Sequence, residues 1–373
     1  MTALTALLIL IVVMVIGVPI PLSFLASASY ICFVNGTDHL MLFTYGFRVQ
    51  NTILLLTIPL FVMAGAVIDK GGIGEKLIEG LERFSKGSKV ALGTVTIVAC
   101  AIFGAVSGSA SATTSCIGSI MTPRLKENGY TAGHIGALLA SSGVLGIMIP
   151  PSILMILYAW GTGTSVLACF LATIVPGIIL IILFSLVNAW LVKHEGPESP
   201  EARAALEQML IDAQKKEAEK KLVKAERDKR KGGTSAIPAV LMPIFLLGGI
   251  YGGVFTTTEG AAFSVLYSLV IGIFYYRKID FPTFRKTLSQ SGETAGTIMV
   301  MLFMVSILSR LYMTENLPDT ILNTLTSISS NRIVLLLMIN LFMIIIGMLM
   351  DDCSGTTLCG PILMPVMGAL GVT

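Results

Sequence analysis

Apolar segments long enough to cross a membrane recur along this chain and exclude most folds. A membrane-spanning helix needs about 20 mostly apolar residues, and fewer where it is re-entrant or packed inside protein. Apolar residues make up 54% of the 373-residue chain and charged residues only 13%, far from the balance of a soluble domain. We therefore predict an all-α polytopic membrane protein that lies in a lipid bilayer. The apolar segments are Ala3–Ile16, Ile53–Ile68, Val166–Val192, Pro238–Ile250, Ala261–Tyr276, Ile298–Leu311 and Ile333–Met350.

The charged residues are concentrated in one segment. Eleven of the 25 Lys and Arg residues and nine of the 22 Asp and Glu residues lie between Leu191 and Lys231. Opposite charges three and four residues apart predict a solvated helix. The excess of Lys and Arg places this insert, residues 195–233, on the cytoplasmic side as a connecting loop or a regulatory arm. Because its basic residues are interleaved with acidic ones, we expect no nucleic-acid partner.

The stretch "FGAVSGSASATTSCIGSIMTP", Phe103–Pro123, is uncharged but too rich in glycine and hydroxyl residues for a plain membrane span. The amphipathic segment before it, Asp69–Lys89, holds five Lys and Arg residues, and Arg124 and Lys126 follow it. Both flanks are therefore predicted to be cytoplasmic. A segment that leaves and returns on the same side is a re-entrant hairpin, which we place at residues 90–123.

The second half of the chain repeats the same order of parts. A cytoplasmic "RKIDFPTFRK" is followed by a span, an amphipathic segment and a second stretch of hairpin type, "GMLMDDCSGTTLCGPILMPVMGALGVT". The second amphipathic segment has one basic residue, Arg332, and should lie on the opposite side of the membrane. Together these features predict inverted repeats, with the second hairpin at about 333–365. Residues that match between the hairpins include Gly104 with Gly347, Ser111 with Ser354, Thr113 with Thr356 and Cys116 with Cys359.

A broken helix is predicted after the first hairpin, in "SSGVLGIMIPPSILMILYAW". Two consecutive prolines beside a glycine interrupt the backbone hydrogen bonds near residues 146–152. An equivalent break in the second repeat would follow Thr373, so we expect that repeat to be C-terminally incomplete or unusually short. The predicted organisation is N-terminal membrane helices (1–52), a first repeat (53–194), the charged insert (195–233) and a second repeat (234–373).

Irregular backbone at membrane depth offers carbonyl oxygens to a cation and helix N-termini to an anion. Hydroxyl oxygens at the first hairpin tip and freed carbonyls at the break suit a hard ion such as Na⁺. Taken singly, each serine could equally serve helix packing. The six cysteines show no metal-ligand spacing, so we expect sodium only and no transition metal. The hydroxyl donors are Ser107, Ser109 and Ser111, and the carbonyl donors are Gly146, Ile149 and Pro151.

Charged side chains inside spans are costly and indicate function unless a local role explains them. Glu259 is either functional or the partner of a threonine three residues earlier in a helix-capping box. Arg310 could lie at the membrane interface, and Asp351 and Asp352 could be exposed at the second hairpin tip. His134, near the first hairpin, is predicted to be an interfacial residue.

Five motifs in order resemble the DctM-like large membrane subunit (M subunit) of tripartite ATP-independent periplasmic (TRAP) transporters. The resemblance covers nearly the whole chain and implies a non-enzymatic, elevator-type transporter that imports organic acids with a sodium gradient. It also implies a bacterial inner-membrane location, a periplasmic substrate-binding protein and a small four-helix membrane subunit. Because Met1 opens directly on the first span, we expect that subunit not to be fused at the N-terminus. The motifs are "IPLFVMAGAVIDKGGI", "FGAVSGSASATTSCIGSIMTP", "IMIPPSILMILYA", "GGIYGGVFTTTEGAA" and "MLMDDCSGTTLCGPILMPV".

The resemblance also implies positions for both ligands. We assign sodium binding to residues of the first hairpin tip, the break and the second hairpin, and substrate binding to polar residues at or near them. The sodium positions are Ser107, Ser109, Gly146, Ile149, Pro151, Gly347 and Asp351. The substrate positions are Ser111, Thr113, Ser152, Glu259, Arg310, Asp352, Ser354 and Thr356.

Two other functions are compatible with parts of the sequence. A stand-alone sodium-coupled anion symporter of related architecture would not need the partner subunits. An intramembrane protease could use a serine of "AVSGS" with His134, or Asp351 with Asp352. A duplicated hairpin has no role in a protease, and no second aspartate lies on a separate span. The transporter subunit therefore remains our prediction.

Overall fold

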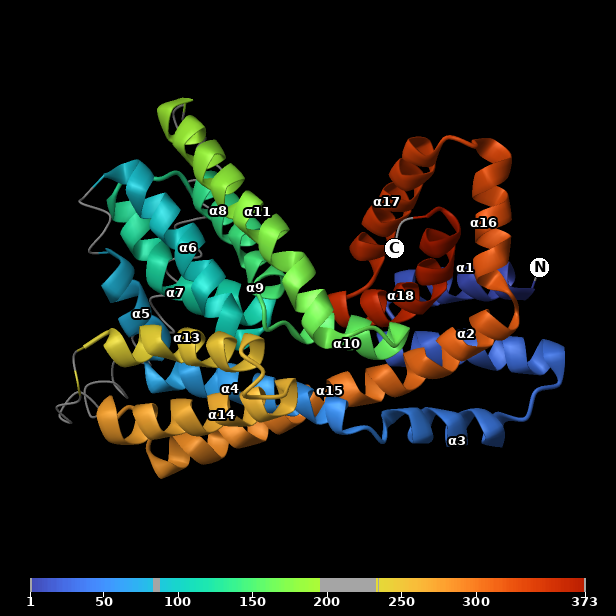
Figure 1. Cartoon of the computed structure of the whole chain (residues 1–373), viewed down its shortest axis with the longest axis horizontal. Helices are drawn as coiled ribbons and strands as arrows, with labels where there is room; N and C mark the ends of the chain where they lie inside the picture. Colours follow the sequence, from blue (N-terminus) through green and yellow to red (C-terminus); the bar gives the residue numbers. More distant parts are fainter. Residues whose placement is uncertain (1, 83–87, 195–232, 234, 372–373) are drawn as a thin grey trace. The chain divides into compact units, whose positions relative to one another are not determined.

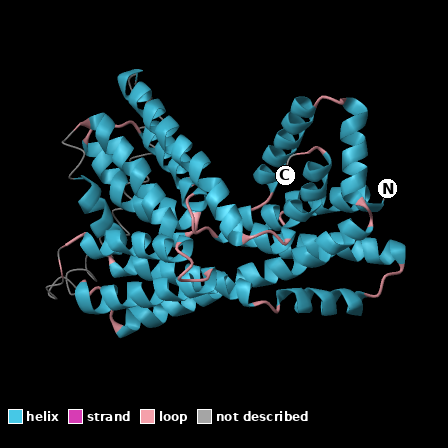
Figure 2. Ribbon diagram, viewed as in Figure 1, coloured by secondary structure: helices cyan, strands magenta, loops and turns pink. Residues whose placement is uncertain are grey.

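The computed structural model of the chain describes residues 2–82, 88–194, 233 and 235–371. Every regular element in these ranges is a helix, and no strand occurs there (Figure 2). Six of the described helices are long and apolar enough to cross a membrane, or seven if one bent pair counts as a single span. The prediction of an all-α polytopic membrane protein is confirmed. The helix predicted for the charged insert lies outside the described residues, apart from Gly233.

The chain divides into two compact units, each assembled from separate stretches of sequence. The first-hairpin unit consists of Leu56–Met155 and Val166–Gly292. The second-hairpin unit consists of Met1–Leu55, Ile156–Ser165 and Glu293–Thr373. We name each unit after the helical hairpin it contains. The inverted repeats stay a prediction.

The first-hairpin unit is built around helix α6, of which 72% of the most apolar window is buried. By contrast, only 11% of the corresponding window of α11 is buried, as expected for a helix that faces lipid. α4 lies beside α14, and the hydroxyls of Thr57 and Thr258 are 2.9 Å apart where the two helices meet (Figure 1). The helices of this unit are α4 (Thr57–Gly71), α5 (Ile73–Glu82), α6 (Lys89–Ser107), α7 (Ala110–Glu127), α8 (Ala132–Gly143), α9 (Leu145–Met148), α11 (Val166–His194), α13 (Ile237–Tyr251), α14 (Thr257–Val270) and η2 (Ile271–Tyr275).

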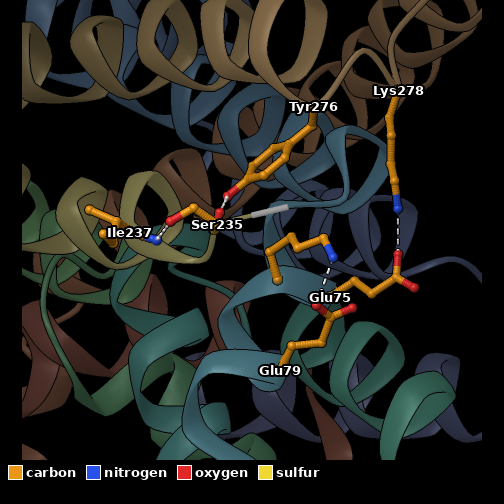
Figure 3. Close-up of polar contacts among 7 residues, drawn as sticks. Glu75, Glu79, Ser235, Ile237, Tyr276 and Lys278 are labelled. Carbon is orange, nitrogen blue, oxygen red and sulfur yellow. Dashed lines mark hydrogen bonds and ion pairs between the residues drawn. The ribbon is translucent and has the colours of Figure 1, made fainter. Parts of the chain in front are cut away.

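Polar contacts tie α5 to the segment that leads into α15 (Figure 3). The Lys278 ammonium lies 2.6 Å from the Glu75 carboxylate. The Tyr276 hydroxyl donates to the carbonyl of Ser235 at 2.9 Å, just after the charged insert. These contacts join stretches that are far apart in sequence.

The second-hairpin unit contains the N-terminal helices and the end of the long helix α15 (Phe281–Thr314). The buried Ser27 hydroxyl donates to the carbonyl of Ala6 at 2.8 Å and lies 3.3 Å from the hydroxyl of Tyr312. One hydroxyl, that of Ser27, thus joins α1, α2 and α15 inside an apolar core. The helices that lie wholly in this unit are α1 (Thr2–Val15), α2 (Ile20–Asn35), α3 (His39–Gln50), α16 (Leu317–Ile328), α17 (Arg332–Leu349) and α18 (Asp352–Ala369). Most of η1 (Ile53–Leu56) and of α10 (Ile153–Thr162) belongs to it as well, although α10 begins in the first-hairpin unit.

Candidate functional site

The first hairpin turns in two residues between α6 and α7. Gly108 adopts a left-handed conformation (φ 61°) and its N–H donates to the carbonyl of Gly104 at 2.8 Å, which ends α6. Ser109 starts α7, because its hydroxyl accepts a hydrogen bond from the N–H of Ala112. The tip therefore brings the C-terminal end of one helix and the N-terminal end of the next to one place. These ends favour a cation and an anion, respectively.

The hairpin tip packs against the break between α9 and α10, where Ile149–Ser152 are not helical. A Cβ added to Gly104 would lie 2.2 Å from the Cα of Gly146, so the two backbones are in direct contact. A Cβ added to Gly108 would lie 3.2 Å from the carbonyl oxygen of Pro151. Side chains larger than hydrogen would separate the tip from the break.

Hydroxyl groups cluster at this contact. The hydroxyls of Ser107 and Thr113 are 3.2 Å apart, and Thr113 also donates to the carbonyl of Ser109 at 2.8 Å. Ser152, at the start of α10, is fully buried and its hydroxyl has no hydrogen-bond partner among the described residues. The buried hydroxyl of Ser142, at the end of α8, has none there either. Buried polar groups are rarely left unpaired, so each of these two needs a partner that the described chain does not supply.

The donors at this contact fit a hard monovalent cation. They are neutral hydroxyl and carbonyl oxygens, which suit Na⁺ better than transition metals. Within the described ranges, no three His, Cys, Asp or Glu side chains are grouped so that they could hold a metal ion. A sodium ion here would supply the missing partner of Ser152.

The structure brings most of the predicted first-hairpin residues together, although their roles stay predictions. Ser111 is exposed, and its hydroxyl lies 3.1 Å from that of Ser109. Ile149 reaches the neighbouring helix α11, where a Cβ on Gly177 would lie 2.6 Å from its side chain. The residues gathered at the tip and the break are Ser107, Ser109, Ser111, Thr113, Gly146, Ile149, Pro151 and Ser152.

Glu259 lies in the same unit, at the first turn of α14. Its carboxylate accepts from the N–H of Thr256 at 2.8 Å, and the Thr256 hydroxyl accepts from the N–H of Glu259 at 3.3 Å. The capping box is therefore confirmed, and it gives this carboxylate a local role. Its assignment to substrate binding stays a prediction.

The second hairpin tip, in the other unit, is acidic. The Asp351 carboxylate caps α18 by accepting from the N–H groups of Cys353 and Ser354, at 3.1 and 3.4 Å, and from the Ser354 hydroxyl. Asp351, Asp352 and Gly347 are exposed, whereas Ser354 is buried with its hydroxyl 2.9 Å from the sulfur of Met301. A Cβ added to Gly347 would meet no described atom within 4 Å, in contrast to one added to its sequence match Gly104.

Two further predicted residues also lie in the second-hairpin unit. Arg310 is exposed on α15, and its guanidinium carbon lies 5.5 Å from the ring centroid of Tyr45. That distance is typical of a cation–π contact. Thr356 is half-buried in the first turns of α18, close in sequence to the capping Asp351.

Two polar features at the first hairpin were not predicted from sequence. The first is the unpaired hydroxyl of Ser142, which was missed because the segment "ASSG" is typical of small residues that pack between helices. The second feature is a hydrogen-bonded group at the base of the hairpin, formed by Tyr130 and Asn188. Asn188 could have been noticed as the single amide in the apolar run "LFSLVNAWLV". His134 is buried at the start of α8, with its ring 4.7 Å from that of Tyr130.

Comparison with known proteins identifies the family of this membrane protein. A family model described as the DctM component of the tripartite ATP-independent periplasmic transporters matches residues 7–373. The chain belongs to the DctM family. It is therefore a multi-pass membrane protein of a transporter permease family, which is not an enzyme family, and the predicted resemblance is confirmed.

Several relatives carry the same family name. The chain is 30% identical over 327 residues to the C4-dicarboxylate TRAP transporter large permease protein DctM of Pseudomonas aeruginosa, covering 87% of this chain and 71% of the relative. It is 28% identical to the sialic acid TRAP transporter large permease protein SiaM of Vibrio cholerae, with 85% and 70% covered. It is 29% identical to the isethionate TRAP transporter permease protein DctMQ of Oleidesulfovibrio alaskensis, with 96% of this chain but only 54% of that relative covered.

Proposed function

We propose that this chain is the subunit through which a TRAP transporter carries an organic acid anion across the bacterial inner membrane, driven by a sodium gradient. The relatives named above are transporters of C4-dicarboxylate, sialic acid and isethionate, which are all organic anions. Their family name describes a tripartite periplasmic transporter, which supports two partners, a small membrane subunit and a periplasmic substrate-binding protein. That the small subunit has four helices is part of the proposal. The proposal covers the class of organic acid anions as a whole.

The observation that carries the ion assignment is the contact between the first hairpin tip and the break. It combines the C-terminal end of α6, the carbonyls of a non-helical segment and the unpaired buried hydroxyl of Ser152. Each of these features favours a cation with oxygen ligands. Sodium bound there would draw Ser107, Ser152 and the break carbonyls toward one point, which fixes the tip against the break.

The anion would bind at the positive, N-terminal end of a helix at the same hairpin tip. Unpaired N–H groups at a helix N-terminus attract negative charge, and α7 starts at the hairpin tip. Positioned hydroxyls such as Ser111 can donate to a carboxylate or sulfonate. Coupling follows if the tip offers these donors in the correct geometry only when sodium holds it against the break.

In the proposed cycle, the binding protein delivers the anion on the periplasmic side. The hairpins then move as one body against a fixed scaffold and expose the bound anion to the cytoplasm. Uncharged side chains and small residues at the tip allow sliding, because they carry no large group across the packed interface. Movement of this elevator type is part of the proposal.

Uptake into proteoliposomes tests the proposal. The full chain would be reconstituted with its small subunit and binding protein, and uptake of labelled succinate, sialic acid and isethionate would be measured with and without an inward sodium gradient. We expect one of these anions to accumulate only with sodium. Ser107→Ala and Ser152→Ala should each raise the half-saturating sodium concentration about five-fold, the effect expected for one lost polar contact of about 1 kcal/mol.

Ser119→Ala provides the matched control. Ser119 is exposed on α7 of the same hairpin, and its hydroxyl donates to the carbonyl of Cys116 within that helix. The half-saturating sodium concentration of the Ser119→Ala variant should equal that of the unaltered chain. Uptake that is indifferent to sodium in the unaltered transporter would reject the ion assignment and shift attention to proton coupling through Glu259 or Asp351.

A further inference from the structure

Helix α11 contacts its unit along one narrow stripe. Its buried residues are Phe170, Gly177 and Asn188. They lie about two and then about three helical turns apart, so all three occupy the same face. Asn188 is the polar member of this stripe and is only 1% exposed. A buried amide in a lipid-facing helix is unfavourable unless it is hydrogen-bonded, and it indicates a function by default.

The Asn188 amide binds the base of the first hairpin. Its nitrogen donates to the carbonyl of Val90 at 3.1 Å, and its oxygen accepts from the hydroxyl of Tyr130 at 3.1 Å. The same Tyr130 hydroxyl lies 2.8 Å from the carbonyl of Lys89. Because Lys89 and Val90 begin α6 and Tyr130 follows α7, one amide holds both ends of the hairpin.

The neighbouring backbone leaves room for this contact. A Cβ added to Gly93 would lie 2.4 Å from both the Asn188 oxygen and the Tyr130 hydroxyl. The Lys89 ammonium donates to the carbonyl of Gly129 at 2.6 Å and lies 5.0 Å from the centroid of the Tyr130 ring. The base of the hairpin is therefore closed by several polar contacts that meet at Asn188 and Tyr130.

The same face of α11 also contacts the break. A Cβ added to Gly177 would lie 2.6 Å from the Ile149 side chain, in the non-helical segment that meets the hairpin tip. α11 is thus connected to both halves of the candidate ion site, to the break through Gly177 and to the hairpin base through Asn188. A tilt of about 4° at the base would displace a tip about 27 Å away by about 2 Å, given the rise per residue of α6.

We propose that Asn188 is a positioning residue for the ion site, which sets the angle at which the first hairpin tip meets the break. This inference rests on the proposed sodium coupling and adds a role for α11. Asn188 touches neither ion nor substrate and acts through the hairpin that it holds. Loss of its hydrogen bonds should therefore weaken sodium binding at a distance.

Sodium titration of thermal unfolding tests the inference without the need for a known substrate. The full chain would be purified with its small subunit, and its unfolding temperature measured as sodium chloride replaces choline chloride at constant ionic strength. Asn188→Leu keeps the approximate size of the side chain but removes both hydrogen bonds. We expect the sodium concentration of half-maximal stabilisation to rise at least about five-fold, which is the effect if one of the two lost bonds contributes fully to sodium binding.

Two further variants make the result decisive. Tyr130→Phe removes only the hydroxyl, which also bonds the Lys89 carbonyl, and should raise the half-maximal concentration in the same direction. Because the two residues share one hydrogen bond, the effect of the double variant should be smaller than the sum of the two single effects. Ser185→Ala, which removes a bond from Ser185 to the Ile181 carbonyl within α11, should leave the sodium response unchanged. If Asn188→Leu fails to fold, Tyr130→Phe carries the test.

The possible failures can be told apart. Lower unfolding temperatures with an unchanged half-maximal sodium concentration, in both Asn188→Leu and Tyr130→Phe, would show a purely structural role and overturn the inference. No sodium response in the unaltered chain would instead reject the proposed coupling ion, and the positioning role with it, before any variant is considered.

Discussion

At the residue scale, the first hairpin tip depends on backbone atoms that touch each other. Gly104 and Gly146 leave no room for a methyl group between α6 and α9. Gly104→Ala should therefore force the helices apart and lower the free energy of unfolding by about 2 kcal/mol, as for other overpacked contacts. Thermal unfolding of the purified protein would measure this loss, and sodium-driven uptake should fall with it.

Gly136→Ala is the matched control for that substitution. Gly136 lies in α8 of the same unit, and a Cβ added there would meet no described atom within 4 Å. Alanine is a better helix former, so this change should raise the free energy of unfolding by up to about 1 kcal/mol. Equal losses in the two variants would mean that the contact between α6 and α9 is not as close as described.

At the element scale, the two hairpin tips end in chemically different caps. Ser109 caps α7 with a neutral hydroxyl, whereas Asp351 caps α18 with a carboxylate that also accepts from Ser354. Asp351 could act as a helix cap or through its negative charge, and substitution can separate the two roles, because asparagine caps helices about as well as aspartate. A loss of stability in the alanine variant that is absent from the asparagine variant is therefore caused by loss of the cap.

Two substitutions of Asp351 distinguish its role as a cap from the role of its charge. Asp351→Ala should lower the free energy of unfolding by about 1 kcal/mol through loss of the cap, and Asp351→Asn should leave it within a few tenths. If the Asp351 carboxylate binds sodium, as predicted from the sequence, both variants should lose sodium-driven uptake. Full uptake by Asp351→Asn would limit Asp351 to a structural role and remove it from the ion site.

The sequence predicted elements better than contacts between them. Glycine, proline and capping residues act locally, so the turn at Gly108, the break at Pro150 and Pro151 and the capping box of Glu259 could be inferred from neighbours in the chain. The meeting of Gly104 with Gly146 could not, because any small residue would have fitted the local pattern. Likewise, Asn188 has its partners about 60 and 100 residues earlier, and nothing local indicates them.

At the second hairpin, the sequence match to the first hairpin does not predict the contacts of the matched residue. Gly347 aligns with Gly104, but it is exposed and makes no close contact within the described part of the chain. Its assigned role in sodium binding therefore rests on the resemblance alone. The physical reason is that a glycine only allows another backbone to come close. A binding site also requires a second segment that does come close, and the matched sequence does not show whether one is there.

At the scale of the whole molecule, one ion pair joins parts of the chain that are 203 residues apart. Lys278 follows η2, and its ammonium donates to the Glu75 carboxylate on α5 (Figure 3). A Cβ on Gly72 would lie 2.4 Å from the lysine stem. A second pair, Lys76 with Glu79 at 2.6 Å, lies within α5 itself. The pair with Lys278 therefore fixes α5 to a distant segment, and the other pair stabilises only the helix.

A charge-swap cycle measures what this long-range pair contributes. The two side chains are 28% and 32% exposed, so we expect a coupling energy of about 0.5 kcal/mol, typical of partly solvated pairs. Glu75→Lys and Lys278→Glu should each lower the unfolding temperature, and the double swap should restore most of it. The coupling should fade near 1 M salt, where screening acts over about 3 Å. Additive losses in the double swap would show that the pair of Lys278 with Glu75 contributes no coupling energy to the attachment of α5.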